Sequence, residues 1–535
     1  MHPGAIAANS PDATAIVLGS RRIDYASLDA ASRRIAVRAR EAGLRRGDVL
    51  AVLAPNSPEF LAAAWGAQRS GLYFLPLSTR LNAADIAYIL SDSGAKLLYI
   101  ADEYWQQGEE GLAQAAEQQA ACRACRFEAA ETLFARAGAP ADPDPVEGGD
   151  MLYTSGTTGR PKGVRAPLDF GPLGSAVSRA ERLRELFDMD SKTRFLTPAP
   201  LYHAAPLRFS MALLRLGGTL VLMPGFDAHA ALSILAEEHI THSQWVPTMF
   251  NRLLALDEEE RNALHAPAHR VAVHAGAPCP EGLKRAMIDW WGQILHEYYS
   301  GTESIGFTHI NSEDWLRHPG SVGRPWRCRV HILNDAGEEC APGETGQVYF
   351  SGRGAPAYHG APEKTAAALS PQGYATMGDI GHIDDAGFLY LTDRRAFTII
   401  SGGVNIYPRE VEDALLMDPR VVEAAVVGRP DADLGEIVAA AVELADQDGA
   451  NENMAHSLRD RLLPLISTYK LPRQIAFVSA MPLTDSGKVH KARLRNEWSA
   501  LTGVTYTLGR PSTSPVIPTG SHPEREASIQ ETPHA

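Results

Sequence analysis

Short apolar runs alternate with capped helical segments along the first part of the chain, and this alternation constrains the fold more than any other feature. Residues 48–54 and 73–77 are apolar runs of strand length. Between them, Ser57 stands at a helix N-cap position with Pro58 directly after it, and Gly71 stands where that helix should end. Proline is favoured in the first helical turn, and a serine hydroxyl caps helix N-termini. This order predicts parallel strands joined by crossover helices.

The same alternation continues along the chain. Asn82 caps a second helix, with Asp85 three residues on, and residues 96–101 form the next strand. Further strands are expected at 219–223, 242–246, 270–275 and 294–298, and helices from Asp227, Pro247 and Glu281. We therefore predict an α/β fold, with a large multi-subdomain N-terminal domain of parallel-rich sheets and crossover helices.

The pattern changes near Asp393 and Arg394. Beyond them we expect helices at 408–417 and 452–466 and strands at 421–428, 436–445 and 474–478. Such a mixture is typical of a small α+β domain. We predict an N-terminal domain over residues 1–393, a C-terminal domain over 394–503 and, because Pro, Ser, Thr and Gly dominate from Val504 onward, a disordered tail over 504–535.

Composition narrows the class of protein. Of the 535 residues, 45% are hydrophobic and 21% charged, an ordinary globular balance, and the net charge of −14 argues against a nucleic-acid partner. The five scattered cysteines fit a reducing compartment, and we take Cys122 and Cys125 as chance spacing within a helix-like stretch between about 101 and 145. Neither a signal-peptide pattern nor an apolar run of membrane-spanning length is present, so we expect a cytoplasmic protein without an integral membrane segment.

Residues 153–164 read Tyr-Thr-Ser-Gly-Thr-Thr-Gly-Arg-Pro-Lys-Gly-Val and concentrate hydroxyls, glycines and one lysine in a single loop. Glycines let the backbone approach a ligand closely. Backbone N–H groups and the hydroxyls of Ser155, Thr157 and Thr158 can donate to phosphate oxygens, and Lys162 adds a positive charge. A Walker loop is excluded because arginine and proline separate the last glycine from the lysine. The loop predicts a polyphosphate site.

Two further motifs suit a nucleotide. Residues 298–303 read Tyr-Tyr-Ser-Gly-Thr-Glu and follow a predicted strand, at the end where open α/β sheets bind ligands. An aromatic ring there can stack on a base, and Glu303 offers the oxygen ligand that Mg²⁺ prefers. Asp379 precedes a predicted hairpin at 383–388, and an ionised aspartate can accept from both hydroxyls of a ribose.

Together these motifs resemble those of the adenylate-forming superfamily, which includes acyl-CoA synthetases, peptide-synthetase adenylation domains and firefly-type luciferases. Matching motifs occur in family order from about Leu28 to Lys488. The resemblance implies a reaction in two halves: a carboxylate attacks the α-phosphate of MgATP to give acyl-AMP and pyrophosphate, and a thiol then displaces AMP. It also implies ATP, Mg²⁺ and coenzyme A as cofactors.

The resemblance assigns roles to individual residues. It implies that Tyr299 stacks on adenine, Thr302 touches the α-phosphate, Glu303 holds Mg²⁺, Asp379 binds the ribose, and Arg394 lies on the ribose or phosphate side. The remaining nucleotide-binding residues that it implies are Thr154, Ser155, Gly156, Thr157, Thr158, Gly159, Lys162, Gly276, Ala277, Pro278, Ser300 and Gly301. The implied catalytic residues are Lys488, Glu303, His203 and Thr158. Ser300 stands where the family usually has glycine, and Met377 interrupts its Thr-Gly-Asp triplet.

In the C-terminal domain the resemblance implies that Ser401, Gly402 and Gly403 flank the tunnel for coenzyme A. Lys488 is expected to leave the site after adenylation while this loop enters. Ala396 stands where the family places an aspartate or lysine hinge, so the hinge position stays open.

The acyl site is the least constrained. His203 is either a core or capping histidine or, by the resemblance, lies at the carboxylate end of the acyl pocket. The other candidate pocket residues are Trp245, Met249, His274, Ala275 and Phe307. Their apolar character favours a hydrophobic acid, and the resemblance favours a fatty, bile or steroid-derived one, with aryl acids as the alternative.

Free coenzyme A is the expected acceptor, because no carrier domain is appended. The alternatives are an adenylating enzyme that loads a separate carrier protein, a luciferase-like oxygenation, and an inactive nucleotide-binding homologue. Retention of Glu303 and Lys488 argues against the last. We expect a monomer or homodimer, and the sequence leaves the chain length of the acid open.

Overall fold

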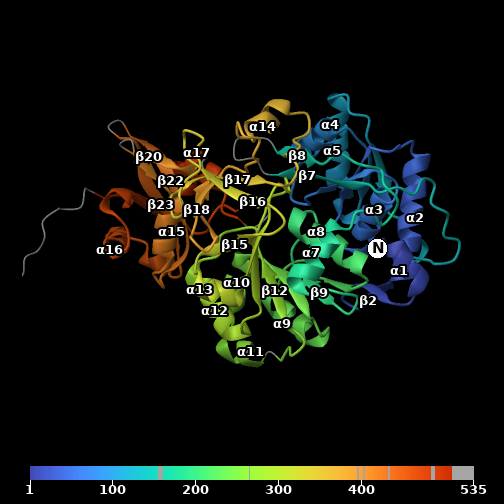
Figure 1. The fold of residues 1–535 in the computed structure, drawn as a ribbon, viewed down its shortest axis with the longest axis horizontal. Helices are drawn as coiled ribbons and strands as arrows, with labels where there is room; N and C mark the ends of the chain where they lie inside the picture. The colour runs from blue at the N-terminus through green and yellow to red at the C-terminus, as the bar shows by residue number, and fades with distance from the viewer. Residues whose placement is uncertain are drawn as a thin grey trace, which may run out of the picture.

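The computed structural model describes residues 1–154, 161–263, 265–394, 397–401, 404–431, 434–483 and 488–508. Figure 1 shows a large region, blue to yellow, that carries most of the chain, and a smaller orange-red region beside it. The large region contains a 13-stranded and a six-stranded sheet, and the small region contains a second six-stranded sheet. The predicted α/β fold is confirmed.

The six-stranded N-terminal sheet has the order β6-β5-β3-β4-β7-β8, and most of its neighbouring strands are parallel. Its strands are β3 (Val49–Leu53), β4 (Tyr73–Leu77), β5 (Ala95–Ile100), β6 (Arg123–Arg126), β7 (Gly149–Thr154) and β8 (Lys162–Arg165). Helices α3 (Pro58–Gln68), α4 (Ala83–Ser93) and α5 (Trp105–Glu117) connect them. The predicted caps are confirmed: the side chain of Ser57 accepts from the Phe60 N–H, and that of Asn82 from the Asp85 N–H.

One expectation in this region is wrong. Cys125 lies in strand β6 and not in a helix-like stretch, because α5 ends at Glu117 and the following residues pair in parallel with β5. Pairing along the open edge of β5 satisfies backbone hydrogen bonds, and this tertiary gain outweighs the local helical preference.

The 13-stranded sheet has the order β16-β17-β18-β19-β15-β14-β13-β12-β11-β9-β10-β1-β2. Its central strands β9 to β13 and β1 pair in parallel, and an antiparallel extension follows from β14. The strands are β1 (Thr14–Leu18), β2 (Arg21–Asp24), β9 (Arg194–Thr197), β10 (Thr219–Leu222), β11 (His242–Trp245), β12 (Val271–His274), β13 (Leu295–Tyr299), β14 (Thr308–Asn311), β15 (Ser321–Pro325), β16 (Arg329–Leu333), β17 (Gly346–Ser351), β18 (Asp379–Ile383) and β19 (Leu389–Arg394).

The helices of this region cover the sheets and link them. They are α1 (Pro3–Asn9), α2 (Tyr25–Glu41), α6 (Ala130–Leu133), α7 (Ser178–Phe187), α8 (Ala204–Leu216), α9 (Ala228–Glu237), α10 (Pro247–Leu254), α11 (Glu258–Ala263), α12 (Glu281–Trp291), α13 (Ser312–Arg317) and α14 (Pro362–Ala367). A single buried apolar cluster includes Trp65 of α3, Phe195 of β9 and Phe209 of α8, so the two N-terminal sheets share one core. Burying apolar side chains between packed layers is the main favourable contribution to such a fold.

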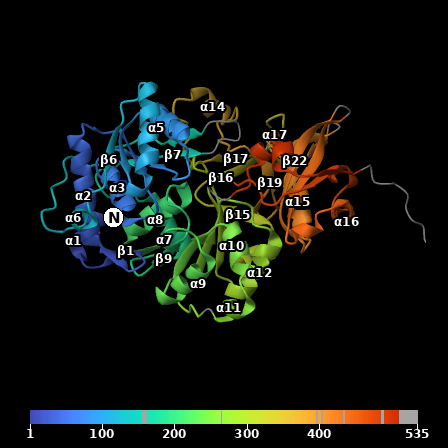
Figure 2. The same ribbon diagram turned by 180° about the vertical axis from the view of Figure 1, so that it is seen from behind.

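The small C-terminal sheet has the order β21-β20-β23-β24-β25, with β22 paired on β23. Its strands are β20 (Ile399–Ser401), β21 (Val404–Ile406), β22 (Val421–Asp431), β23 (Gly435–Leu444), β24 (Gln474–Phe477) and β25 (Thr505–Thr507). Its helices are α15 (Pro408–Leu416), α16 (Glu452–Leu462), α17 (Lys491–Asn496) and α18 (Trp498–Leu501). In Figures 1 and 2, α15 lies on the side nearer the N-terminal region and α16 on the outer side.

The predicted tail starts too early. Residues 505–507 form β25, which pairs antiparallel with β24, and Leu508 is buried with 2% of its surface exposed. Alternating Thr and Tyr residues suit an edge strand, and Tyr506 packs against Phe477. Residues 509–535 lie outside the described residues.

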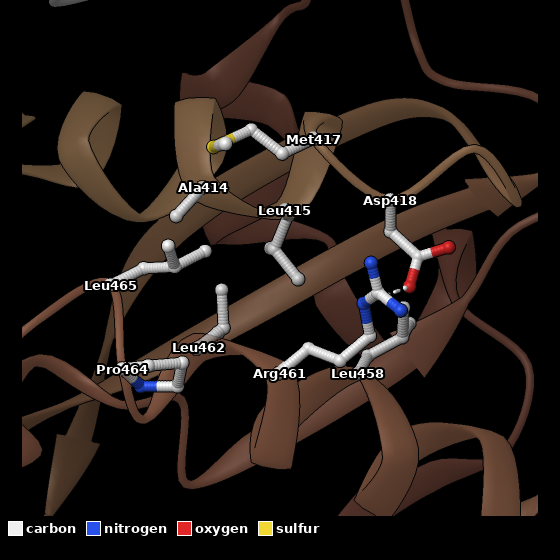
Figure 3. Close-up of a pocket in the computed structure, with 9 residues that line it drawn as sticks. All are labelled: Ala414, Leu415, Met417, Asp418, Leu458, Arg461, Leu462, Pro464 and Leu465. Carbon is white, nitrogen blue, oxygen red and sulfur yellow. Dashed lines mark ion pairs between the residues drawn. The ribbon is translucent and has the colours of Figure 1, made fainter.

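An apolar groove of about 300 Å³ lies between α15 and α16 (Figure 3). The side chains of Leu415, Leu462 and Leu465 point toward one another there, and an ion pair of 3.0 Å between Arg461 and Asp418 closes one end. The groove shows that α15 packs against α16 only in part.

Candidate active site

The carboxyl ends of three neighbouring strands place the predicted motifs at one edge of the large sheet. Strands β11, β12 and β13 are parallel, and Trp245 is the register partner of His274, which in turn pairs with Glu297. The segments after these strands therefore start side by side, as at the ligand-binding edge of open α/β sheets. Gly276 has φ +92°, a conformation that favours glycine.

The candidate acyl-pocket residues on and near these strands are buried. Trp245 is 1% exposed and packs against Phe250 and Trp291, with ring centres 6.3 and 5.4 Å away. Phe307 is fully buried and stacks on Tyr298 at 5.0 Å. Met249 and Ala275 are also buried, with 8% and 7% exposed. The interior beneath this edge is thus lined mainly by apolar and aromatic groups.

His274 is the polar member of this set. Its ring is fully buried, packs edge-on against Phe250 and lies 3.7 Å from the Glu297 carboxylate, which is held by Lys284 at 2.7 Å. Burial, with a further contribution from the Lys284 charge, holds the pKa of His274 well below its usual range. The imidazole is therefore neutral at pH 7.

His203 stands at the N-cap position of α8 with an extended backbone, φ −89° and ψ 150°. Within the described part of this helix its imidazole makes no capping hydrogen bond. The ring is half-buried and packs edge-on against Tyr202 at 4.6 Å. The ring therefore lies at the head of α8, where it remains partly accessible.

The predicted phosphate loop joins two paired strands. β7 and β8 are antiparallel, and Thr154 is the register partner of Lys162. Residues 155–160, which carry the predicted Ser155, Gly156, Thr157, Thr158 and Gly159, lie outside the described residues.

Hydrogen bonds fix the stem of this hairpin on both sides. The Tyr88 hydroxyl of α4 donates to the Pro161 carbonyl at 3.2 Å, and the His359 N–H donates to the Gly163 carbonyl at 2.8 Å. The Arg165 N–H donates to the Ala357 carbonyl at 3.1 Å. The stem is thus held by α4 and by the segment that contains Tyr358.

Glu303 and Lys162 both lie near Tyr358. The Tyr358 hydroxyl donates to Oε1 of Glu303 at 2.9 Å, and the Lys162 ammonium lies 5.7 Å from the centre of the Tyr358 ring. A Cβ atom on Gly301 would lie 2.6 Å from Oε2 of Glu303 and 2.3 Å from the sulfur of Met377. Only glycine fits at 301 while the carboxylate stays in place. This partly exposed, oriented carboxylate beside a cation fits the donor set that Mg²⁺ takes when it also binds phosphate.

A largely buried ion pair links β7, the strand that leads into the phosphate loop, to the aromatic motif of residues 298–303. Nε of Arg208 in α8 contacts Asp150 at the start of β7 at 2.6 Å, and the same guanidinium donates to the Thr302 carbonyl at 2.9 Å. Burial alone would raise the pKa of Asp150, but Arg179 and Arg208 hold it below its usual range. Asp150 is therefore ionised at all physiological pH values.

The ribose candidates also come together. The Tyr299 hydroxyl donates to the Asp379 carboxylate, and Asp379 is the register partner of Arg394 across β18 and β19. Gly378, directly before Asp379, has φ +83°. Met377, which interrupts the family triplet, packs against Gly301, so the substitution places a thioether between the two motifs.

The C-terminal residues lie on a separate sheet. Lys488 is exposed, and Leu483 and Val489 on either side of it form a bridge. Ser401 ends β20 and is half-buried. Gly402, Gly403 and the hinge candidate Ala396 lie outside the described residues.

Sequence reasoning missed Tyr358, Arg208 and Asp150. None of them lies in a recognisable motif, and their partners are between 55 and 94 residues away along the chain. A search for polar residues that face the known motifs in space finds them, but no local pattern does.

The chain is similar to known proteins along most of its length. The family model described as AMP-binding enzyme matches residues 5–357, and the one described as AMP-binding enzyme C-terminal domain matches residues 410–488. The chain is 35% identical over 486 residues to the long-chain-fatty-acid–CoA ligase FadD13 of Mycobacterium tuberculosis, covering 90% of this chain and 94% of the relative. It is 35% identical over 498 residues to a feruloyl-CoA synthase of an Amycolatopsis species, covering 91% and 96%.

Solved structures share the whole architecture. ATP-bound MatB of Rhodopseudomonas palustris superposes with a TM-score of 0.79 at 27% identity, covering 93% of this chain and 99% of that one. The o-succinylbenzoate-CoA synthetase MenE of Bacillus subtilis, in complex with an acyl-adenylate, superposes with a TM-score of 0.78 at 27% identity, covering 93% and 97%. Across the described ranges, no helix combines the length and the apolar character that crossing a bilayer requires.

Glu423 in β22 predicts a pH-dependent stability. Burial, together with the neighbouring Glu412 and Glu443 carboxylates, raises the pKa of Glu423 from 4.5 to about 7. The folded chain therefore binds more protons than the unfolded chain between these values, and the free energy of unfolding falls as pH rises through this window. Glu423→Gln should leave stability nearly unchanged at pH 5 and raise it by an amount on the order of 2 kcal/mol at pH 8. Scanning calorimetry at pH 5 to 8 measures the difference.

Glu497→Gln is the matched control, because Glu497 forms an exposed pair with Arg493 and should show no such trend. A difference between Glu423→Gln and the parent chain that is equal at every pH contradicts the prediction.

Proposed function

The chain belongs to the AMP-binding enzyme family, and from this premise we propose that it joins a hydrophobic carboxylic acid to coenzyme A. It is an acid–thiol ligase of the AMP-forming type, and its small-molecule substrates are the acid, ATP and coenzyme A, with Mg²⁺ as the metal. In the first half-reaction a carboxylate oxygen bonds to the α-phosphorus, and the bond from that phosphorus to the pyrophosphate oxygen breaks. In the second half, the sulfur of coenzyme A bonds to the acyl carbon, AMP leaves and the thiol proton passes to solvent.

The charges of the reactants determine what the site must supply in the first half-reaction. Both reactants are anions, so the site must supply positive charge and fixed geometry. Lys162, at the stem of the phosphate loop, faces the polyphosphate, and we assign Lys488 to the reacting carboxylate and α-phosphate. Glu303, oriented by Tyr358, would hold Mg²⁺, which when bound neutralises phosphate charge.

The nucleotide would lie along the edge formed by the motifs. We assign Tyr299 to stacking on adenine, and Asp379 with Arg394 to the ribose. The hydrogen bond from Tyr299 to Asp379 supports this, because it fixes the ring and the carboxylate relative to each other. Arg208 holds the Thr302 carbonyl, so the segment next to the α-phosphate is also fixed in place.

The observation that carries the choice of acid is the buried apolar wall at the ends of β11 and β12. Trp245, Met249 and Ala275 are each less than 9% exposed. A pocket lined in this way favours an acid whose body is apolar, with His203 at the carboxylate end. We propose a fatty, bile or steroid-derived acid, in line with the fatty-acid ligase among the relatives.

An aryl acid is the second candidate. The aromatic cluster of Trp245, Phe250 and Trp291 could stack on a planar ring, and a feruloyl-CoA synthase is equally similar in sequence. A carrier protein as acceptor is the further alternative, since a fatty acid–acyl-carrier-protein ligase of Streptomyces coeruleorubidus is 30% identical.

A panel of acids tests the assignment. Purified chain with MgATP and coenzyme A should release AMP with decanoate, palmitate or cholate, and much less without coenzyme A. Faster turnover of ferulate than of all three would favour the aryl alternative. AMP release that needs a carrier protein instead of coenzyme A would favour that acceptor, and no AMP with any acid would support an inactive homologue.

Lys488→Ala should separate the two half-reactions. We expect acid-dependent exchange of pyrophosphate into ATP to fall by about 100-fold or more, because the charge on the attacking anion is no longer offset. Thioester formation from supplied acyl-AMP and coenzyme A should stay within about threefold of the parent. Lys470→Ala, in the same domain, serves as control. Equal loss in both assays would show that Lys488 does not have this role.

Tyr358→Phe should weaken Mg²⁺ binding. Without the hydroxyl, the Glu303 carboxylate loses its orienting donor, and the Mg²⁺ dissociation constant in the presence of ATP should rise about tenfold. Calorimetric titration of Mg²⁺ with ATP present and no acid measures this. Tyr374→Phe is the control, because Tyr374 stacks on His331 instead. An unchanged constant would remove Tyr358 from the site.

A further inference from the structure

Acidic side chains hold both ends of the segment that carries Lys488. This segment leaves the core at Met481, which is 6% exposed, and re-enters regular structure at Lys491, the first residue of α17. The His490 N–H donates to the Pro482 carbonyl at 2.7 Å, so the two ends also lie against each other. Lys488 thus lies close to the point where the described residues 481–483 and 488–491 contact each other; we call these residues the base of the Lys488 turn.

Glu443 holds the first end. Its carboxylate accepts from the Met481 N–H at 2.8 Å. Glu443 lies in the central strand β23, which pairs with β22 on one side and β24 on the other. The first end of the turn is therefore anchored to the middle of the C-terminal sheet through a charge-assisted hydrogen bond.

Glu412 holds the second end. Nζ of Lys491 contacts the Glu412 carboxylate at 2.8 Å, and the two side chains are only 15% and 12% exposed. The same carboxylate accepts from the Val426 N–H of β22 at 2.6 Å. Glu412 therefore joins α15, β22 and the turn. Lys491 also lies 5.7 Å from the ring centre of Phe397, the first described residue after the domain junction.

Glu423 is the fourth member of a charged cluster that also contains Glu412, Glu443 and Lys491. It is the cross-strand partner of Glu443 in β22, and its carboxyl group interacts electrostatically with Glu412, Glu443 and Lys491. Lys491 is the cation among these four groups and offsets the repulsion between the carboxylates. Without the charge of Lys491, three acidic groups would face one another at the base of the turn. Their electrostatic repulsion would favour separation of the two ends of the turn.

We propose that Glu412, Glu443 and Lys491 are positioning residues for Lys488. They set the place of Lys488 relative to α15 and the C-terminal sheet without touching a substrate. This inference rests on the role assigned to Lys488 under the proposed function. A displacement of about 1 Å in a catalytic group can cost on the order of 100-fold in rate, so a fixed base matters for the adenylation step alone.

Lys491→Met tests the inference. It keeps the length of the side chain and removes the charge. With MgATP and decanoate, or whichever acid of the panel the parent converts fastest, pyrophosphate exchange should fall by about 10- to 100-fold in kcat. The KM for ATP should change less than about threefold, and thioester formation from supplied acyl-AMP should stay within about twofold. Lys491→Arg should recover most of the exchange, since it restores the cation.

Lys470→Met is the matched control. It breaks a second lysine–glutamate pair of α15, between Lys470 and Glu410 at 2.6 Å, whose partners are not among the residues at the base of the turn. Both half-reactions should stay near the parent rate. Thermal unfolding is measured for every variant, and Glu412→Gln replaces Lys491→Met if the latter does not fold.

The outcomes separate this inference from the proposed function. Loss of exchange in both Lys488→Ala and Lys491→Met, with thioester formation retained, supports it. Two results would overturn the positioning role and leave the role of Lys488 standing. In the first, pyrophosphate exchange is lost in Lys488→Ala but normal in Lys491→Met. In the second, Lys491→Met loses both half-reactions equally. Normal exchange in Lys488→Ala overturns both.

Discussion

Arg208 joins, through one guanidinium group, two motifs that the chain keeps far apart. It pairs with Asp150 at the base of the phosphate-loop strand and donates to the Thr302 carbonyl in the aromatic motif. The side chains of the pair are only 15% and 14% exposed, so little water screens them. Breaking a buried pair of this kind leaves an uncompensated charge, which is far costlier than losing a surface pair. The phosphate-loop strand and the aromatic motif are therefore held in one frame.

Local signals in the sequence were sufficient for much of the fold. The caps at Ser57 and Asn82 depend on hydrogen bonds within three residues, and strand β3 is a continuous apolar run. Strands β6 and β25 were not predicted from the sequence, because each is stabilised by pairing with the edge of another strand. Their residues show little apolar character of their own, so only the neighbouring strand determines their conformation.

The residues of the candidate site also fall into a group that the sequence predicts and a group that it does not. Glu303, Asp379 and Lys162 stand in recognisable patterns, and the structure places Glu303 and Lys162 near Tyr358 and Asp379 beside Tyr299. Tyr358, which orients Glu303, and Arg208, which holds the Thr302 carbonyl, lie in stretches without a pattern. Residues that contact the ligand are constrained in type and spacing by its chemistry, whereas the groups that support them need only reach the right point in space. Sequence reasoning therefore finds the former and misses the latter.

The carboxylate cluster at Glu412 bears on how the C-terminal domain can work. β21 runs directly into α15, so the segment at Ser401 and the helix that carries Glu412 form one continuous unit. Glu412 in turn holds the base of the Lys488 turn through Lys491. The segments proposed to carry Lys488 and to bind coenzyme A are thus both next to α15, and moving the base of the Lys488 turn away from α15 would break a largely buried ion pair. The exchange of Lys488 for the Ser401 segment that the proposed function requires would therefore move both segments together, as in a rotation of the whole domain.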